Sequence, residues 1–311
     1  MTILITGAHG FVGKHVVDIL QRGEEYILTP KREQLDILDS SAWSLQHPDA
    51  NVNLRHYIKS NNVDAIVHLA ATCGGIGINK DNPGRFIYEN LQMGINVLEA
   101  ARMTGVKKVV NLGTVCAYPK FAEVPFREET IWNGYPEETN APYGIAKKTI
   151  MEMGIAYATQ YGMEVTNLVP VNMAGEYDNF DLYSSHVIPA LIRKFEEADG
   201  KVTLWGTGSA SREFLYAGDC ARAISVALER NVGPQPINLG TGKEITIRDL
   251  AELIQRIGEY DVEIEWDSTK PDGQPRRCLD VTRAKNTLRW EAQTSLEETL
   301  RRTISWYRSN A

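Results

Sequence analysis

The sequence has no apolar run that approaches the roughly 20 residues of a membrane-spanning helix. It also has no excess of basic side chains, because 33 Lys and Arg stand against 40 Asp and Glu, for a net charge of −7. An acidic chain without a basic surface is a poor ligand for nucleic acids and for anionic membranes. We therefore expect neither a nucleic acid nor a membrane among its partners.

Cysteine is scarce, and no two cysteines form a Cys-x-x-Cys pair. The four positions are Cys73, Cys116, Cys220 and Cys278. This spacing argues against a structural zinc site and a disulfide framework, so we expect reduced thiols and no metal. The first residues enter an apolar strand directly, without the basic segment and cleavage site of a signal peptide. The sequence thus predicts a cytoplasmic location.

What the sequence does contain is an alternation of strands and helices in its first half. Short apolar strands are predicted at residues 3–5, 26–28, 65–69, 108–112 and 165–169. Helical patterns lie between the strands, most clearly over residues 91–104 and 143–161. Strands separated by helices imply a parallel sheet with right-handed crossovers. The predicted fold class is therefore α/β, a Rossmann-like doubly wound parallel sheet.

A glycine motif, Gly7-x-x-Gly10-x-x-Gly13, lies between the first strand and its helix. Glycines at this place permit a tight turn and the close approach of a pyrophosphate to the helix N-terminus. The spacing differs from the usual Gly-x-Gly-x-x-Gly, and an ordinary strand–turn–helix connection can also be rich in glycine. The strand before the motif and the helix after it favour a dinucleotide cofactor.

The residues after the second strand indicate which dinucleotide is bound. Folds that bind NAD usually place an acid there to hold the ribose hydroxyls. This chain has Thr29-Pro30-Lys31-Arg32, with two cations that suit a 2′-phosphate. A solvated pair of loop charges is the alternative, and Glu33 follows immediately. The sequence favours NADP over NAD.

From about Val171 the strict alternation fades. Helices are predicted at residues 186–198, 218–228, 246–257 and 294–307, the third with Thr246 as its N-cap. We expect an NADP-binding Rossmann domain over residues 1–170. A smaller, mixed α/β substrate-binding domain is expected mainly over residues 171–311; this boundary is approximate, and a crossing of the chain between the domains is left open.

Tyr143 and Lys147 are four residues apart in a predicted helix, so they lie on the same helix face. An ammonium group there would favour the phenolate and lower a phenol pKa that is about 10 in water. A phenol tuned in this way can transfer a proton to or from an alcohol or a ketone oxygen near neutral pH. The same spacing also occurs on ordinary solvated helices, so the pair depends on its context.

Further motifs are spread along nearly the whole chain. They are Val67-His-Leu-Ala-Ala71, Gly74-Gly-Ile76, Leu112-Gly-Thr-Val-Cys-Ala-Tyr-Pro-Lys120, Thr139-Asn-Ala-Pro-Tyr-Gly-Ile-Ala-Lys147, Asp178-Asn-Phe180, Ser185-His-Val-Ile-Pro-Ala-Leu191, Trp205-Gly-x-Gly208, Arg212-Glu-Phe-Leu215 and Asp272-Gly-Gln-Pro-Arg276. Together with the glycine motif they resemble the extended short-chain dehydrogenase/reductases, and among these the GDP-L-fucose synthase family. The segments around Cys116 and His186 are the most specific part of this resemblance.

The resemblance implies a redox centre of Tyr143, Lys147 and Thr114. Tyr143 would protonate the C4 oxygen of a ketone, and Lys147 would lower the pKa of Tyr143 and hold the nicotinamide ribose. Thr114 replaces the serine usual in the family and keeps a hydroxyl that can bind the reacting oxygen. Taken alone, Thr114 would be read as a strand-end residue that bonds the backbone.

The resemblance also implies that Cys116 and His186 form an epimerisation pair. Inverting a stereocentre beside a ketone requires a base on one face and an acid on the other. In isolation, Cys116 would be read as a small buried hydrophobe and His186 as a satisfied polar residue. The family usually carries larger side chains at the positions of Ala117 and Ala174, so we expect room for a different or bulkier hexose there.

Binding residues follow from the same resemblance. The implied contacts to NADP(H) are Gly7, Gly10, Phe11, Val12, Gly13, Lys31, Arg32, Asp36, Ala70, Leu112, Lys147, Pro170, Asn172, Met173 and His186. The implied contacts to a GDP-sugar are Lys194, Trp205, Arg212 and Asp272, where a surface Lys, a core Trp and a salt-bridged Arg are the plainer alternatives. The family also implies a homodimer, formed through helices that flank the central sheet.

The function implied in this way is NADPH-dependent epimerisation and C4-keto reduction of a GDP-4-keto-6-deoxy-hexose. The product would be GDP-L-fucose or a related GDP-sugar. One alternative is a C4-keto reductase on a related GDP-4-keto sugar, with Cys116 and His186 idle. Another is a non-catalytic nucleotide-binding scaffold, which the presence of both Tyr143 and Lys147 disfavours.

Overall fold

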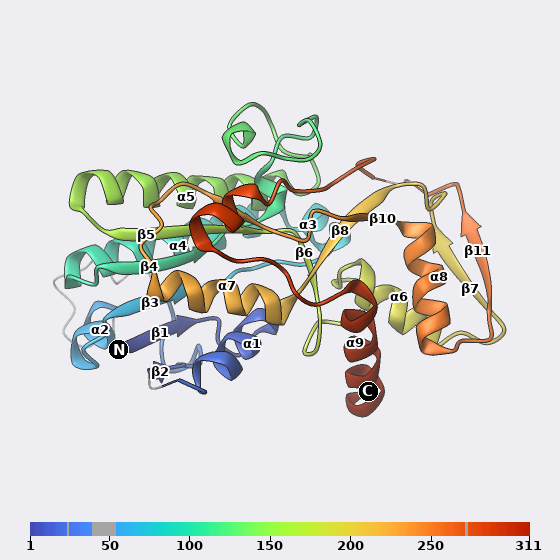
Figure 1. Cartoon of the computed structure of the whole chain (residues 1–311), viewed down its shortest axis with the longest axis horizontal. Helices are drawn as coiled ribbons and strands as arrows, with labels where there is room; N and C mark the ends of the chain where they lie inside the picture. The colour runs from blue at the N-terminus through green and yellow to red at the C-terminus, as the bar shows by residue number, and fades with distance from the viewer. Residues whose placement is uncertain (24, 39–53, 271–272) are drawn as a thin grey trace.

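A parallel sheet forms the centre of the larger part of the molecule (Figure 1). The computed structural model describes residues 1–23, 25–38, 54–270 and 273–311. Within these residues the sheet has six strands in the order β2-β1-β3-β4-β5-β9, and every pairing is parallel. The strands are β1 (Thr2–Thr6), β2 (Tyr26–Leu28), β3 (Ala65–His68), β4 (Lys108–Leu112), β5 (Glu164–Pro170) and β9 (Ile237–Leu239).

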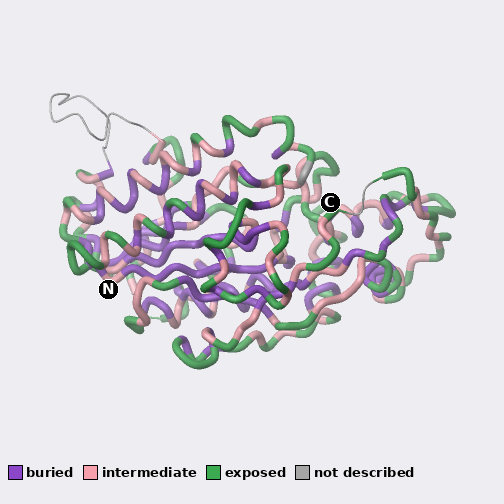
Figure 2. The backbone as a smooth tube through the Cα atoms, turned by 90° about the horizontal axis from the view of Figure 1, so that it is seen from above, coloured by how far each residue is buried: buried purple, intermediate pink, exposed green. Residues whose placement is uncertain are grey.

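Helices cover both faces of this sheet, as the doubly wound prediction requires (Figure 1). One face packs against α1 (Phe11–Leu20) and α7 (Ala217–Glu229). The other packs against α2 (Leu54–Ser60), α4 (Pro83–Thr104) and α5 (Ala141–Tyr161). The strands are therefore buried from both sides, which explains their continuous apolar sequences, and Figure 2 shows them as the most buried part of the molecule.

The predicted strands agree with the observed ones, and the main difference in the first half concerns α4. This helix begins at Pro83, eight residues before the expected start at Leu91. Proline suits the first turn of a helix because that turn needs no amide donor there. The first turns of α4 also carry polar residues, so they lack the apolar period on which the prediction rested.

The second half builds two smaller sheets and a separate core. After β6 (Asn172–Ala174), the elements are α6 (Val187–Glu196), β7 (Lys201–Trp205), β8 (Ser211–Tyr216), β10 (Glu244–Thr246), α8 (Ile247–Gly258), β11 (Glu263–Asp267) and α9 (Leu296–Asn310). One sheet has the order β10-β8-β6, and the other pairs β11 with β7. Helices α6, α8 and α9 share one apolar cluster. Thr246 caps α8 as predicted, accepting a hydrogen bond from the Asp249 amide at 3.0 Å.

The chain returns to the large sheet after residue 171, because α7 packs on α1 and β9 pairs with β5. Helix α3 (Ile76–Asp81) is a short helix that lies between β3 and α4 in the sequence. Among the described helices, none combines the length and the apolar character that a membrane span requires.

Candidate active site

The glycine motif forms a cradle that only glycines can build. Gly7 has a φ of +75°, and a Cβ atom there would lie 2.7 Å from the Ala70 backbone nitrogen. A Cβ atom on Gly13 would lie 2.1 Å from the Gly7 carbonyl oxygen. Gly10 caps α1, and its amide donates to the Gly7 carbonyl at 3.0 Å. The turn therefore leaves the N-terminus of α1 open to an anion, and the residues present fit a dinucleotide pyrophosphate.

Lys31 and Arg32 are exposed beyond the end of β2, where a 2′-phosphate can reach them. Arg32 approaches Asp36 at 3.4 Å, and their side chains are 68% and 43% exposed. An exposed pair of this kind contributes little to stability, so Arg32 remains available to a stronger anion. Asp36 is thus an anionic neighbour of Arg32, and its own contact with the cofactor stays a prediction.

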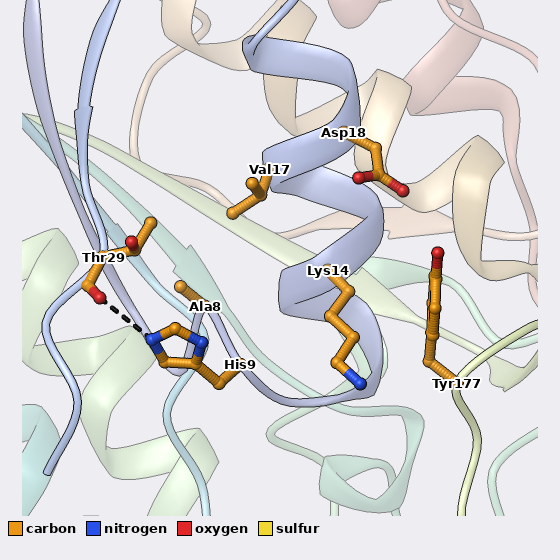
Figure 3. Close-up of a pocket in the computed structure, with 7 residues that line it drawn as sticks. All are labelled: Ala8, His9, Lys14, Val17, Asp18, Thr29 and Tyr177. Carbon is orange, nitrogen blue, oxygen red and sulfur yellow. Dashed lines mark hydrogen bonds between the residues drawn. The ribbon is translucent and has the colours of Figure 1, made fainter.

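His9, which the sequence prediction missed, lies beside these cations. Its Nε2 atom is 2.9 Å from the Thr29 carbonyl oxygen (Figure 3). His9 and Thr29 line one side of a cavity of about 270 Å³, and Lys14 and Tyr177 lie on the other side of it (Figure 3). The position of His9 inside the glycine motif was the signal that could have identified it.

The remaining expected cofactor residues lie where the parallel strands end. Ala70, Leu112 and Pro170 lie at the carboxyl ends of β3, β4 and β5, and Phe11 and Val12 begin α1. Asn172 and Met173 follow in β6, where the Asn172 amide donates to the Glu213 carbonyl at 3.2 Å. Ligands of open α/β sheets bind beyond this edge. The fold therefore gathers these residues on one side, as a cofactor site requires.

Lys147 is held in the interior by the end of β4. Its side chain lies on α5, is 4% exposed, and donates a hydrogen bond to the Leu112 carbonyl at 3.0 Å. Burial lowers the pKa of the Lys147 ammonium from 10.5 to about 8, and the nearby Cys73 opposes this change. The bond to Leu112 fixes the ammonium at the edge of the sheet that faces the cofactor site.

The expected effect of Lys147 on Tyr143 is wrong for this structure. Burial raises the pKa of the Tyr143 phenol well above 10, and the neighbouring Cys73 and Cys116 raise it further. A hydrogen bond with Thr114 is the opposing influence. The physical reason is that the Lys147 ammonium faces a backbone carbonyl while the phenol is surrounded by protein. Tyr143 therefore enters the site as a neutral phenol with a proton to give.

Thr114 has the backbone-bonding role that was weighed for it, and its binding of a reacting oxygen stays a prediction. Its hydroxyl accepts the Cys116 amide at 3.2 Å and so caps the short 3₁₀ helix Val115–Ala117. The same hydroxyl lies within hydrogen-bonding range of Tyr143. This capping bond positions Thr114 and Cys116 together, one turn apart, beside the phenol.

Cys116 has a guanidinium group beside its sulfur. The Arg277 Nη1 atom lies 3.7 Å from the Cys116 Sγ atom. Gln274 holds that guanidinium through Nη2 at 3.0 Å, and its own amide donates to the Lys120 carbonyl at 2.8 Å. Arg277 was not among the predicted site residues. It places a positive charge where a negatively charged sulfur would form.

Cys73 is a further group that the sequence prediction did not assign. It is exposed to solvent, yet the surrounding protein raises the pKa of its thiol. Lys147, Asp178 and Cys116 all act electrostatically on this sulfur. Cys73 thus lies at the meeting point of the redox residues and the loop that contains Asp178.

His186 ends that loop and caps α6. Burial lowers the pKa of its imidazole below 6.5, so the neutral form is favoured. The loop is held against the segment after Cys73, because the Gly75 amide donates to the Ser184 carbonyl at 2.8 Å. A Cβ atom on Gly75 would lie 2.4 Å from the Ser185 carbonyl oxygen, so this approach requires glycine.

The residues expected to contact the GDP-sugar are Lys194, Trp205, Arg212 and Asp272. Trp205 is 66% exposed, and the amino groups of Lys194 and Lys270 lie 5.6 Å and 5.8 Å from its ring centroid. An exposed tryptophan between two cations suits a nucleotide rather than a core role, and Lys270 is an addition to the prediction. Arg212 donates to the Ser211 carbonyl at 2.7 Å and lies against Gly273. Asp272 lies outside the described residues.

Ala117 and Ala174 do not enlarge the site. Both are 0% exposed and belong to the apolar clusters of the two halves. Neighbouring core side chains occupy the space that larger residues would fill. The expectation that these alanines make room for a bulkier hexose is therefore wrong.

Comparison with known proteins finds relatives that match this chain over nearly its whole length. GDP-L-fucose synthase of Escherichia coli (strain K12) is 37% identical, covering 99% of this chain and 97% of that protein. GDP-L-colitose synthase of Yersinia pseudotuberculosis is 34% identical, with 99% and 98% covered. The crystal structure of a GDP-L-fucose synthetase from Naegleria fowleri bound to NADP has a TM-score of 0.88 and 26% identity, with 99% and 93% covered.

A GDP-mannoheptose C4 reductase from Campylobacter jejuni with NADP bound has a TM-score of 0.86 and 25% identity, covering 99% of this chain and 98% of that one. The profile of the family described as "NAD dependent epimerase/dehydratase family" matches residues 3–240. That range runs from β1 to the end of β9 and includes the glycine cradle, Tyr143, Lys147 and His186. The chain belongs to the NAD dependent epimerase/dehydratase family.

Proposed function

We propose that this protein is an NADPH-dependent enzyme that epimerises a GDP-4-keto-6-deoxy-hexose and reduces its C4 ketone. The product is GDP-L-fucose or a related GDP-sugar. The observation that carries this proposal is the convergence of Tyr143, Thr114, Cys116 and Cys73 beside buried Lys147, at the edge of the sheet that bears the glycine cradle. The similarity to GDP-L-fucose synthases over nearly the full chain supports it.

Reduction uses the neutral Tyr143 phenol. When bound, NADPH supplies a hydride to C4 of the ketone. Tyr143 donates its proton to the C4 oxygen as negative charge develops there, and Thr114 hydrogen-bonds to the same oxygen. Lys147 orients the cofactor ribose, and the tyrosinate that remains takes a proton from solvent. These steps convert the ketone into an alcohol.

Epimerisation uses the thiol and the imidazole. One of the two groups removes the proton from the carbon beside the ketone, and the bonding electrons move into an enolate. The other group returns a proton to the opposite face, which inverts the stereocentre. Arg277 lies beside the Cys116 sulfur and stabilises negative charge on it. His186 is neutral, and its ring can accept or, once protonated, donate a proton.

Reduction without epimerisation is the second candidate function. The fold similarity to a GDP-mannoheptose C4 reductase over nearly the whole chain favours it. In this case Cys116 and His186 bind the sugar but exchange no proton.

Incubation with GDP-4-keto-6-deoxymannose and NADPH in heavy water separates these functions. Epimerisation places deuterium on the carbons beside the ketone, and mass spectrometry of the product detects it. We expect this incorporation in the wild type and a loss of about 100-fold or more in its rate in Cys116→Ser, because a hydroxyl is a far weaker base. Complete turnover without incorporation would exclude epimerisation and leave the reductase.

We further propose a homodimer in which α4 and α5 pack against a second copy. Large side chains on these helices are exposed, namely Tyr88 at 60%, Met103 at 42% and Tyr161 at 45%. Buried between two copies, these side chains would leave water. Light scattering after size-exclusion chromatography tests this proposal, and a monomer at micromolar concentration would refute it. We also propose that the segment from about residue 171 supplies most of the substrate contacts.

A further inference from the structure

Asp178 is a buried carboxyl group with one oxygen that the described protein does not satisfy. The residue is 7% exposed, and its Oδ1 atom accepts the Asn179 amide at 2.7 Å. Its Oδ2 atom is buried and has no hydrogen-bond partner among the described residues. Burial raises the pKa of this carboxyl from 3.8 to about 7. Because buried polar atoms in proteins are nearly always paired, a free one in a site suggests a missing ligand.

This free oxygen belongs to the candidate active site. Asp178 acts electrostatically on the Cys73 thiol, which also interacts with Lys147, Cys116 and Tyr143. The mechanism proposed above uses Lys147, Cys116 and Tyr143 but gives Asp178 no role. The carboxyl therefore lies among the catalytic side chains without taking part in the chemistry assigned to them.

A second free polar atom lies on the same stretch, residues 175–186, called here the 175–186 loop. The Ser185 hydroxyl is also buried and has no partner among the described residues. The loop itself is well braced, because Asp181 accepts the Tyr183 amide at 3.2 Å and the Ser184 amide at 3.0 Å. These bonds fix part of the loop backbone; a third atom without a hydrogen bond, Glu176 Oε2, lies 3.9 Å from His15 Nε2.

We propose that Asp178 and Ser185 form a subsite for the hexose, in which the free Oδ2 atom of Asp178 hydrogen-bonds to a ring hydroxyl of the bound GDP-sugar. This inference rests on the proposed function. A hydroxyl suits both atoms because it donates and accepts hydrogen bonds, whatever the protonation of the carboxyl. The hexose rather than the cofactor is assigned because the loop ends at His186 and leads into α6, which carries Lys194 beside Trp205.

The substitution Asp178→Asn tests this subsite with almost no change in volume. It alters the charge and the hydrogen-bonding pattern of the carboxyl. We expect the KM for GDP-4-keto-6-deoxymannose to rise about 10-fold or more, since a hydrogen bond to a charged group has about that value. The inhibition constant of GDP, which has no hexose, and the affinity for NADPH should change less than about twofold.

Thermal unfolding of the ligand-free protein distinguishes binding from a structural role. A carboxyl kept for a ligand costs stability when the ligand is absent, so the midpoint of Asp178→Asn should equal or exceed that of the wild type. Asp219→Asn is the matched control. Asp219 is 2% exposed, and its carboxylate accepts the Gln293 amide at 2.7 Å and the Thr294 amide at 2.8 Å. This control should unfold at a lower temperature and keep the wild-type KM.

Each outcome of these measurements either supports or overturns the hexose subsite. A raised KM with unchanged GDP and NADPH binding, repeated more weakly in Ser185→Ala, supports the subsite. An Asp178→Asn enzyme with wild-type KM, or one that loses NADPH affinity equally, overturns it while wild-type turnover still upholds the proposed function. A wild type that turns over no GDP-4-keto sugar overturns the proposed function itself, and the hexose assignment with it.

Discussion

The two sides of the active site satisfy their polar groups in different ways. On the sheet side, buried Lys147 donates to Leu112, and Thr114 caps the helix that carries Cys116. On the side of the 175–186 loop, Asp178 and Ser185 keep buried polar atoms without partners among the described residues. Lys147 and Thr114 thus find their partners within the protein, whereas we propose that the substrate pairs with the free atoms of Asp178 and Ser185.

This difference follows from how each side is built. The sheet side rests on parallel strands that are buried on both faces, so its backbone and side chains are fixed by the fold. The loop side crosses between the large sheet and the smaller core, where specificity for a sugar can vary without disturbing the sheet. Reduction is thus assigned to the rigid side, and recognition of the hexose to the loop.

The largest effect is expected on the sheet side, from a substitution of the proton donor Tyr143. Tyr143→Phe removes the phenol and keeps the ring, so we expect NADPH oxidation with the GDP-4-keto sugar to fall about 1,000-fold, within the usual range for a general acid. NADPH should still bind, which fluorescence of the reduced nicotinamide can report. Activity within 10-fold of the wild type would show that another group protonates the ketone.

The second prediction concerns Lys147, whose substitution should separate stability from activity. The folded pKa of about 8 lies below the 10.5 of the unfolded chain, so the ammonium costs about 3 kcal/mol of stability below pH 8. The cost disappears as the pH rises from about 8 to about 10.5, because both states then lose the proton.

Lys147→Met should therefore have a higher free energy of unfolding than the wild type at pH 7. The loss of the hydrogen bond to Leu112 reduces this gain. The difference between the two proteins should shrink as the pH rises from about 8 to about 10.5. Its turnover should fall about 100-fold. Urea unfolding at several pH values measures the difference, and a constant difference from pH 7 to 11 would contradict the assigned pKa.

The smallest effect is expected from a substitution of Glu213, a carboxyl group that accepts hydrogen bonds from the surrounding protein. Glu213 is 0% exposed and accepts the Gly242 and Leu279 amides, each at 2.7 Å. Glu213→Gln places an amide donor against these donors, so we expect a loss of about 2 kcal/mol in the free energy of unfolding. The KM for the GDP-sugar should stay near the wild-type value. A Glu213→Gln protein as stable as the wild type would remove the contrast with Asp178.

The sequence was sufficient to predict five strands of the central sheet, but not the sixth, β9 (Ile237–Leu239). Strands β2 and β4 were predicted with the observed bounds, because each is a short, largely apolar run between polar segments. The start of α4 was not predicted, since its first turns mix polar residues with Phe86, Ile87 and Tyr88 and do not show a clear apolar period. Residues beside the glycine motif or in the most specific segments were likewise identifiable from the sequence.

Tyr143 and Lys147 show what could not be predicted from the sequence. Their spacing on one helix was visible in the sequence, and the structure places both on α5. The direction of the Tyr143 pKa was not visible, because it depends on burial and on Cys73 and Cys116, which come from other segments. Local spacing shows that two groups are neighbours, but the surroundings decide their charge.

The sequence by itself determined the alternation of strands and helices in the first half, the glycine cradle and the helix that carries the Tyr143–Lys147 pair, because these depend on local patterns. Only the tertiary structure decided that Arg277 lies beside Cys116 and that Ala117 and Ala174 are packed in the core. It alone brought Asp178 to Cys73 with a free oxygen. Such contacts join residues far apart in the chain, so burial and partners become defined only when the chain is folded.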